Sequence, residues 1–136
     1  MNLYIKFVLV MVIFLTVDII YLKSISEYFT KHAKKMKLRN IYNPISFILV
    51  YVALFIVLYH FILKNINLNK SLKLDILKNA FILGFCIYAV FDLTNYTLFK
   101  NWPIPLIIID SLWGGLLFSI VTILYHKLMG ILSYYV

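Results

Sequence analysis

The chain has 136 residues, of which 64% are apolar and only 13% are charged, and its formal net charge is +8. A soluble domain has about 45–50% apolar residues, and a chain this short has too small an interior to bury the excess. The composition therefore excludes an ordinary soluble domain and a disordered chain, and it predicts a multi-pass membrane protein.

Four segments are apolar enough, and long enough at about 20 residues, to cross a bilayer as helices. They are roughly residues 3–22, 45–63, 79–98 and 104–126. We therefore expect an all-α fold, an integral membrane four-helix bundle with short connections. We expect it to form a single domain over residues 1–136.

The first connection, residues 23–43, is basic and carries apolar residues at helical spacing. This pattern predicts either a continuation of the first helix into the lipid headgroups or a short interfacial helix. Its basic side chains are candidates for binding anionic headgroups: Lys31, Lys34, Lys35, Lys37 and Arg39. Pro44 then predicts the start of the second membrane helix, because the first helical position needs no N–H donor.

The remaining connections predict the pairing of the last two helices. Residues 64–78 form a polar connection, whereas residues 99–103 leave only five residues between the third and fourth helices. The last two helices should therefore form a tight antiparallel hairpin. Seven of the 13 basic residues fall on the side of the first and third connections and six on the other, so the positive-inside rule predicts no orientation.

Three of the five acidic residues, Asp18, Asp92 and Asp110, lie within the predicted membrane helices. A charged side chain at the bilayer centre costs about 2.5–3.5 kcal/mol even on insertion scales, so such residues need a partner, a proton or a polar cavity. Because successive helices reverse direction, all three should lie about 6–9 Å below the side that carries the first and third connections. We therefore expect them to meet in one layer.

Each of these acids has a hydrogen-bond donor three residues further on, and hence on the same helix face. The donors are Tyr21, Asn95 and Trp113. The pattern has two interpretations, an aromatic-walled polar pocket open to one side or a buried hydrogen-bond network that locks the helices together. The candidate pocket residues are Asp18, Tyr21, Asp92, Thr94, Asn95, Trp102, Asp110 and Trp113.

Signatures of other chemistry are weak. The three histidines, His32, His60 and His126, are not spaced four residues apart as a helical zinc site requires, so we predict no metal site and no cofactor. No Gly-rich phosphate loop and no Gly-x-Ser-x-Gly motif occurs. The single cysteine, Cys86, excludes an intrachain disulfide.

The third and fourth helices carry a motif set that resembles a known family. The motifs are Phe91-Asp92-Leu93-Thr94-Asn95-Tyr96, Trp102-Pro103 and Asp110-Ser111-Leu112-Trp113-Gly114. They resemble the Tyr-Asp-Leu-Thr-Asn, Trp-Pro and Asp-x-x-Trp-Gly pattern of domain-of-unknown-function family 2177, whose earlier Asp-x-x-Trp-Leu is similar to Asp18 with Tyr21-Leu22. Phe91 replaces the usual Tyr, and Tyr21 replaces the usual Trp. The resemblance implies a small integral membrane protein and implies no activity.

These observations favour a membrane protein that binds or moves a small polar solute, a cation or a proton. Two alternatives remain open, an intramembrane lipid-modifying enzyme and a structural partner of a larger membrane complex; the absence of a catalytic motif favours a non-enzyme. The expected partners are the lipid bilayer and further copies of the chain, with no nucleic acid, because the basic residues lie between apolar runs. The expected location is the cell or inner membrane.

Overall fold

The computed structural model describes residues 3–33 and 43–135. Four α-helices follow one another, α1 (Leu3–Ala33), α2 (Pro44–Phe61), α3 (Leu74–Leu98) and α4 (Ile104–Tyr135), and a short 3-10 helix, η2 (Leu63–Asn65), follows α2. All four α-helices are long and apolar enough to cross a membrane. The predicted all-α four-helix class is confirmed, and the described residues contain no strand.

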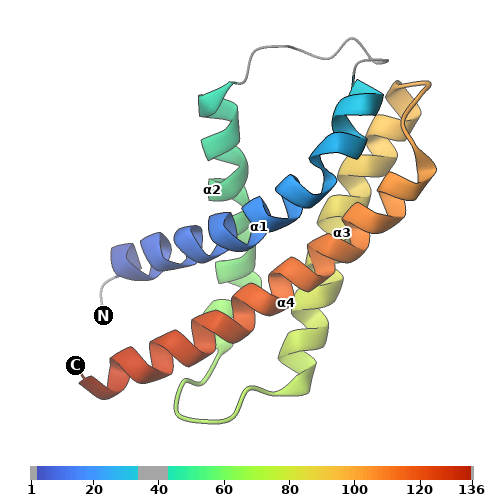
Figure 1. Cartoon of the computed structure of the whole chain (residues 1–136). Helices are drawn as coiled ribbons and strands as arrows, with labels where there is room; N and C mark the ends of the chain where they lie inside the picture. The colour runs from blue at the N-terminus through green and yellow to red at the C-terminus, as the bar shows by residue number, and fades with distance from the viewer. Residues whose placement is uncertain (1–2, 34–42, 136) are drawn as a thin grey trace.

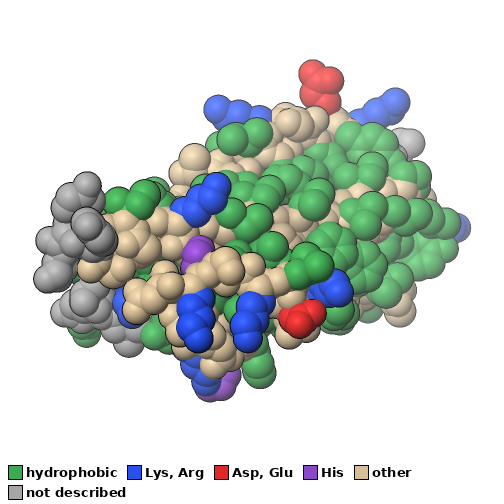
Figure 2. Space-filling view, turned by 90° about the horizontal axis from the view of Figure 1, so that it is seen from below, with side chains coloured by type: hydrophobic (Ala, Val, Ile, Leu, Met, Phe, Trp, Pro, Cys, Tyr) green, Lys and Arg blue, Asp and Glu red, His purple; other side chains and the backbone are tan. Residues whose placement is uncertain are grey.

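Successive helices run in opposite directions (Figure 1). The end of α4 and the α2–α3 connection lie at one end of the molecule, which we call the terminal end, whereas α1 begins partway along the length of the molecule (Figure 1). The α3–α4 turn and the ends of α1 and α2 that lead into residues 34–42 lie at the other, which we call the turn end. Figure 2 looks onto the terminal end, where Lys side chains gather beside an otherwise apolar surface.

This arrangement predicts that the α2–α3 connection and the α3–α4 turn lie on opposite sides of the membrane. Asn67 and Asn101 are exposed and belong to these two connections. In a Cys86→Ala background, single cysteines at the two positions should be labelled by an impermeant thiol reagent from opposite sides of sealed vesicles. Labelling of both from the same side would contradict the four-span topology.

Three helices extend beyond the apolar segments that predicted them, and one of these, α4, continues from residue 126 to Tyr135. α1 continues to Ala33. Over the described residues, the basic connection therefore begins as a continuation of the first helix and not as a separate short helix. α3 begins at Leu74, five residues before the predicted apolar segment, with Asp75 in its first turn. An acidic residue there interacts favourably with the helix dipole, and Ile76 packs against the apolar core. Hydropathy locates a membrane span, but these end interactions determine where the helix begins.

α2 begins at Pro44, as its sequence predicts, and the structure shows that Asn43 caps it. Pro44 is the first helical residue, and the Asn43 side chain accepts hydrogen bonds from the N–H groups of Ile45 (3.1 Å) and Ser46 (3.2 Å). Replacing Asn43 by alanine removes the only acceptor that these two bonds share. We expect Asn43→Ala to lower stability by about 1 kcal/mol, measured by thermal unfolding of the purified protein. An Asn43→Asp variant, which keeps the acceptor, should retain most of that stability.

α3 and α4 pack against each other through small residues, as the tight hairpin predicted. A Cβ atom on Gly84 would lie 2.1 Å from the carbonyl oxygen of Gly114, and one on Gly114 would lie 2.6 Å from that of Gly84. Glycine at both positions therefore allows the two backbones to touch. This contact places Tyr88 and Asp92, one and two helical turns beyond Gly84 on α3, on the side that faces α4.

The apolar core lies toward the terminal end. Its fully buried members include Val10 and Phe14 of α1, Leu58 of α2, and Phe118 and Met129 of α4. On α1 the core stops one turn before Asp18, and on α4 it begins one turn after Trp113. The polar residues of the predicted pocket therefore lie between this core and the turn end.

Candidate functional site

Asp18, at the middle of α1, is the most fully hydrogen-bonded of the three acids. Its side chain is 5% exposed. The Tyr51 hydroxyl of α2 donates to Oδ2 at 2.5 Å, and the Trp113 indole N–H of α4 donates to Oδ1 at 2.9 Å. One carboxylate thus holds three helices together, and both of its oxygens have partners inside the protein.

Asp110, six residues into α4, accepts a hydrogen bond from the Tyr21 hydroxyl of α1. The Tyr21 ring stacks on Trp113, with 4.5 Å between ring centroids and 8° between planes. Tyr21 of α1 therefore bonds the acid of α4, while Trp113 of α4 bonds the acid of α1. The two helices are antiparallel and share the Asp-x-x-aromatic spacing, so each acid lies level with the aromatic of the other helix.

This crossed pairing differs from what the three-residue spacing suggests. Side chains three positions apart on one helix point the same way and both reach the facing helix, so each finds its partner there. Asp18 and Asp110 also interact electrostatically. Two of the three acids expected to share a layer therefore belong to one group with Tyr21, Tyr51 and Trp113, joined by hydrogen bonds and by the stacking of Tyr21 on Trp113. We call this group the Asp18–Asp110 cluster.

Asp92 lies outside this cluster. Its side chain is fully buried, and the Trp102 indole N–H donates to Oδ1 at 3.1 Å, while Oδ2 has no hydrogen-bond partner among the described residues. The donor to Asp92 is thus Trp102 of the α3–α4 turn, and Asn95, its expected companion, is only half-buried. Thr94 is exposed. The Asp92–Trp102 bond ties the end of α3 to the turn that follows it.

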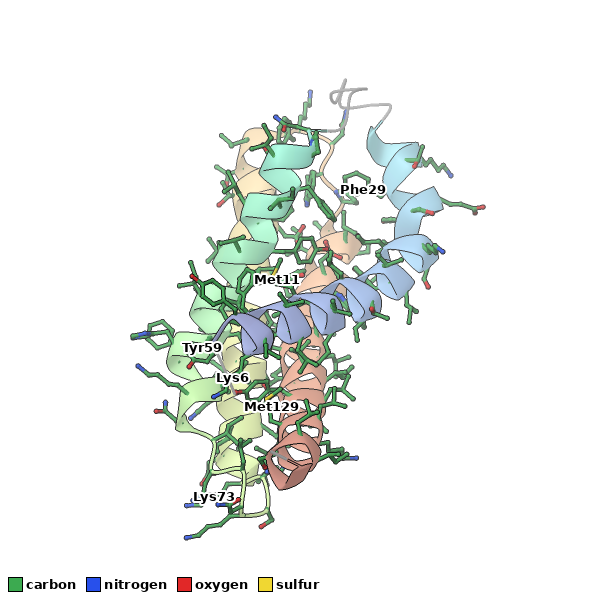
Figure 3. All side chains as sticks on the ribbon, turned by 90° about the vertical axis from the view of Figure 1, so that its left-hand side faces the viewer. Lys6, Met11, Phe29, Tyr59, Lys73 and Met129 are labelled. Carbon is green, nitrogen blue, oxygen red and sulfur yellow. The ribbon has the colours of Figure 1, made fainter. Side chains whose placement is uncertain are left out.

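A partly open cavity of about 590 Å³ lies beside the Asp18–Asp110 cluster, and all four helices contribute to its walls. Residues of α1 recur three and four apart from Asp18 to Thr30, so one helix face forms a wall about 18 Å long. Phe29, on this wall, points from α1 toward the interior (Figure 3). Of the predicted pocket residues, Asp18, Tyr21 and Asp110 line the cavity. Asp92, Thr94, Asn95, Trp102 and Trp113 are not part of its lining.

Two tyrosines of the site were not predicted. Tyr51 of α2 bonds Asp18, and Tyr88 of α3 lines the cavity within electrostatic range of Asp18 and Asp92. A tyrosine in the middle of an apolar span needs a partner for its hydroxyl when it is buried. Their positions near the centres of two such spans are the sequence signal that could have identified them.

The remaining candidates lie elsewhere. No group of three or more His, Cys, Asp or Glu side chains within residues 3–33 and 43–135 is placed to hold a metal ion, so the three acids do not form one metal-binding cluster. His126 contacts the carbonyl of Lys70 at 2.9 Å, and His60 lies beside Lys64. Lys31 is exposed near the end of α1. The other headgroup candidates, Lys34, Lys35, Lys37 and Arg39, lie outside the described residues.

Comparison with known proteins agrees with the motifs and the fold. A family model described as predicted membrane protein (DUF2177) matches residues 3–126, which include α1, α2, α3, most of α4 and the three intramembrane acids. Neither a curated protein nor a solved structure matches the chain. With this match over most of its length and four apolar helices, the chain belongs to the DUF2177 family of predicted membrane proteins.

Proposed function

We propose that this membrane protein binds a small molecule in the cavity beside the Asp18–Asp110 cluster. The observation that carries the proposal is the cavity itself, about 590 Å³ in volume, with two carboxylates among otherwise largely apolar walls. Binding sites for small molecules are typically concave and apolar, with a few polar groups that orient the ligand. The cavity has the volume of such a site.

The acids could instead form a network that only locks the helices together. Such a network explains the hydrogen bonds, but it does not explain the cavity beside them. Membrane helices commonly pack closely through small residues, as α3 and α4 do at Gly84 and Gly114. Beside Asp18 and Asp110 the helices instead leave room for a ligand. A ligand in this position would contact all four helices.

The proposal extends to location and assembly. The cell or inner membrane suits a chain whose spans are all helical, because a helix satisfies its own backbone hydrogen bonds in lipid. Four helices make a thin wall around a path across a bilayer, so movement of the bound molecule to the other side would need several copies of the chain.

The test uses the full chain in lipid nanodiscs and the neutral fluorescent probe N-phenyl-1-naphthylamine. Binding should be saturable after subtraction of the signal from empty nanodiscs. Ile25 lines the cavity wall on α1, so Ile25→Trp should fill the space and remove the saturable binding. Leu112, exposed on α4 and outside the lining, provides the matched control, and Leu112→Trp should bind as the wild type does. Binding that is not saturable, or that survives Ile25→Trp, would contradict the proposal.

A further inference from the structure

The charged residue types that line the cavity are acidic. Its lining includes Asp18 and Asp110 and, among the described residues, no Lys, Arg or His. The chain as a whole is basic, with a net charge of +8, so the cavity is an acidic site in a basic protein. Charge complementarity therefore favours a cation over an anion or a neutral molecule.

The walls of the cavity show what kind of cation fits. Six of the lining residues are aromatic: Tyr21, Phe29, Phe47, Tyr51, Tyr88 and Phe91. The faces of aromatic rings attract cations, and this attraction is stronger where water is excluded, as in sites that bind quaternary ammonium groups. A metal ion would need a compact group of oxygen ligands, and no group of three suitable side chains occurs in the part of the chain that the structure describes.

The burial of the lining residues indicates the path of entry. Asp18, Tyr51 and Leu54 are buried at the inner end of the cavity, while Leu22, Val50 and Phe91 are exposed at its rim. These rim residues of α1, α2 and α3 are apolar, and the exposed polar lining residues, Ser26 and Thr30, lie further along α1. In a bilayer the apolar part of the rim faces lipid chains, which favours a ligand that is itself soluble in the apolar part of the membrane.

We propose that the ligand is a lipophilic organic cation, with its positive charge beside Asp18 and Asp110 and its apolar body against the aromatic walls. This inference rests on the proposed function, because it names the class of molecule that the cavity binds. Each carboxylate offers about four lone-pair positions, so Asp18 can accept from a ligand in addition to Tyr51 and Trp113. Asp110 is only half-buried and is the acid more accessible to the ligand.

Two ions of the same shape and opposite charge, tetraphenylphosphonium and tetraphenylborate, provide the test. In nanodiscs that contain the full chain, tetraphenylphosphonium should bind saturably and displace N-phenyl-1-naphthylamine, and tetraphenylborate should not. Asp110→Asn keeps an acceptor for the Tyr21 hydroxyl while removing the charge. It should weaken tetraphenylphosphonium binding by about tenfold or more, a much larger change than it causes in the binding of the neutral probe.

The control variant is Asp75→Asn, which removes an exposed acid near the start of α3 and should change neither affinity. Equal binding of the two ions, or unchanged cation affinity in Asp110→Asn, would overturn the inference. If the neutral probe still binds and Ile25→Trp still removes it, the proposed function survives that result. If neither the probe nor the cation binds saturably, both proposals fail.

Discussion

Gly84→Ala is expected to destabilise the protein by about 3 kcal/mol or more, although it adds a single methyl group. The Cβ atom would lie 2.1 Å from the Gly114 carbonyl oxygen and 2.7 Å from the Phe118 ring. A side chain can rotate away from such a contact, but the carbonyl belongs to the backbone of α4, so the two helices must separate. The loss should appear as a lower unfolding temperature of the detergent-solubilised protein, followed by size-exclusion chromatography.

Gly130→Ala is the matched control, because Gly130 also lies in α4 but a Cβ there would meet only the Leu68 carbonyl oxygen, at 3.9 Å. Alanine is the better helix former by about 0.5–1 kcal/mol, so this variant should be neutral or stabilising. Gly114→Ala should behave like Gly84→Ala, since its Cβ would lie 2.4 Å from the Tyr88 ring and close to the Gly84 carbonyl. Similar stability of the Gly84 and Gly130 variants would contradict the close contact between α3 and α4.

The second large effect is expected from Asp18→Leu. Leucine has nearly the shape of aspartate but accepts no hydrogen bond, so the Tyr51 hydroxyl and the Trp113 N–H would lose their acceptor. A buried donor left without a partner costs about 1–3 kcal/mol, which predicts a loss of about 2–6 kcal/mol for the two donors. Asp18→Asn should cost less, because its amide oxygen can accept from Trp113 while its NH₂ group donates to the Tyr51 oxygen.

A double-mutant cycle separates these hydrogen bonds from the packing of the leucine side chain. In a Trp113→Phe background only the Tyr51 hydroxyl loses its acceptor, so Asp18→Leu should cost about 0.5–3 kcal/mol less there than in the wild type. Unfolding temperatures of the four proteins in one detergent measure the coupling. Additive effects would show that Trp113 and Asp18 do not stabilise each other.

Much of the fold could be predicted because its signals are local. A run of about 20 apolar residues predicts a membrane helix wherever it occurs, and Pro44 and the five-residue turn predict a helix start and a hairpin without reference to the rest of the chain. The limits of α1 and α3 were less predictable. Residues 23–33 and 74–78 are polar enough to lie outside a membrane span, yet they remain helical.

For the candidate site, the sequence located the unusual residues but not their partners. The presence of Asp18, Asp92 and Asp110 in apolar spans follows from hydropathy alone. The hydrogen-bond partners of these acids do not follow from hydropathy, because a hydrogen bond between helices depends on how far each helix is shifted and rotated against the next. Asn95 lies one turn from Asp92, yet the donor to Asp92 is Trp102, which the turn folds back against α3.

The sequence by itself thus determined the membrane class, the four helices, the α3–α4 hairpin and the three intramembrane acids, because hydropathy and helical period are properties of each segment alone. Only the tertiary structure decided that Asp18 and Asp110 exchange aromatic partners between α1 and α4, that Tyr51 completes their cluster, and that Asp92 lies outside it. The close packing of α3 against α4 at Gly84 and Gly114 is likewise visible only in the tertiary structure. These features depend on the positions of whole helices relative to one another, which the spacing of residues within one helix does not specify.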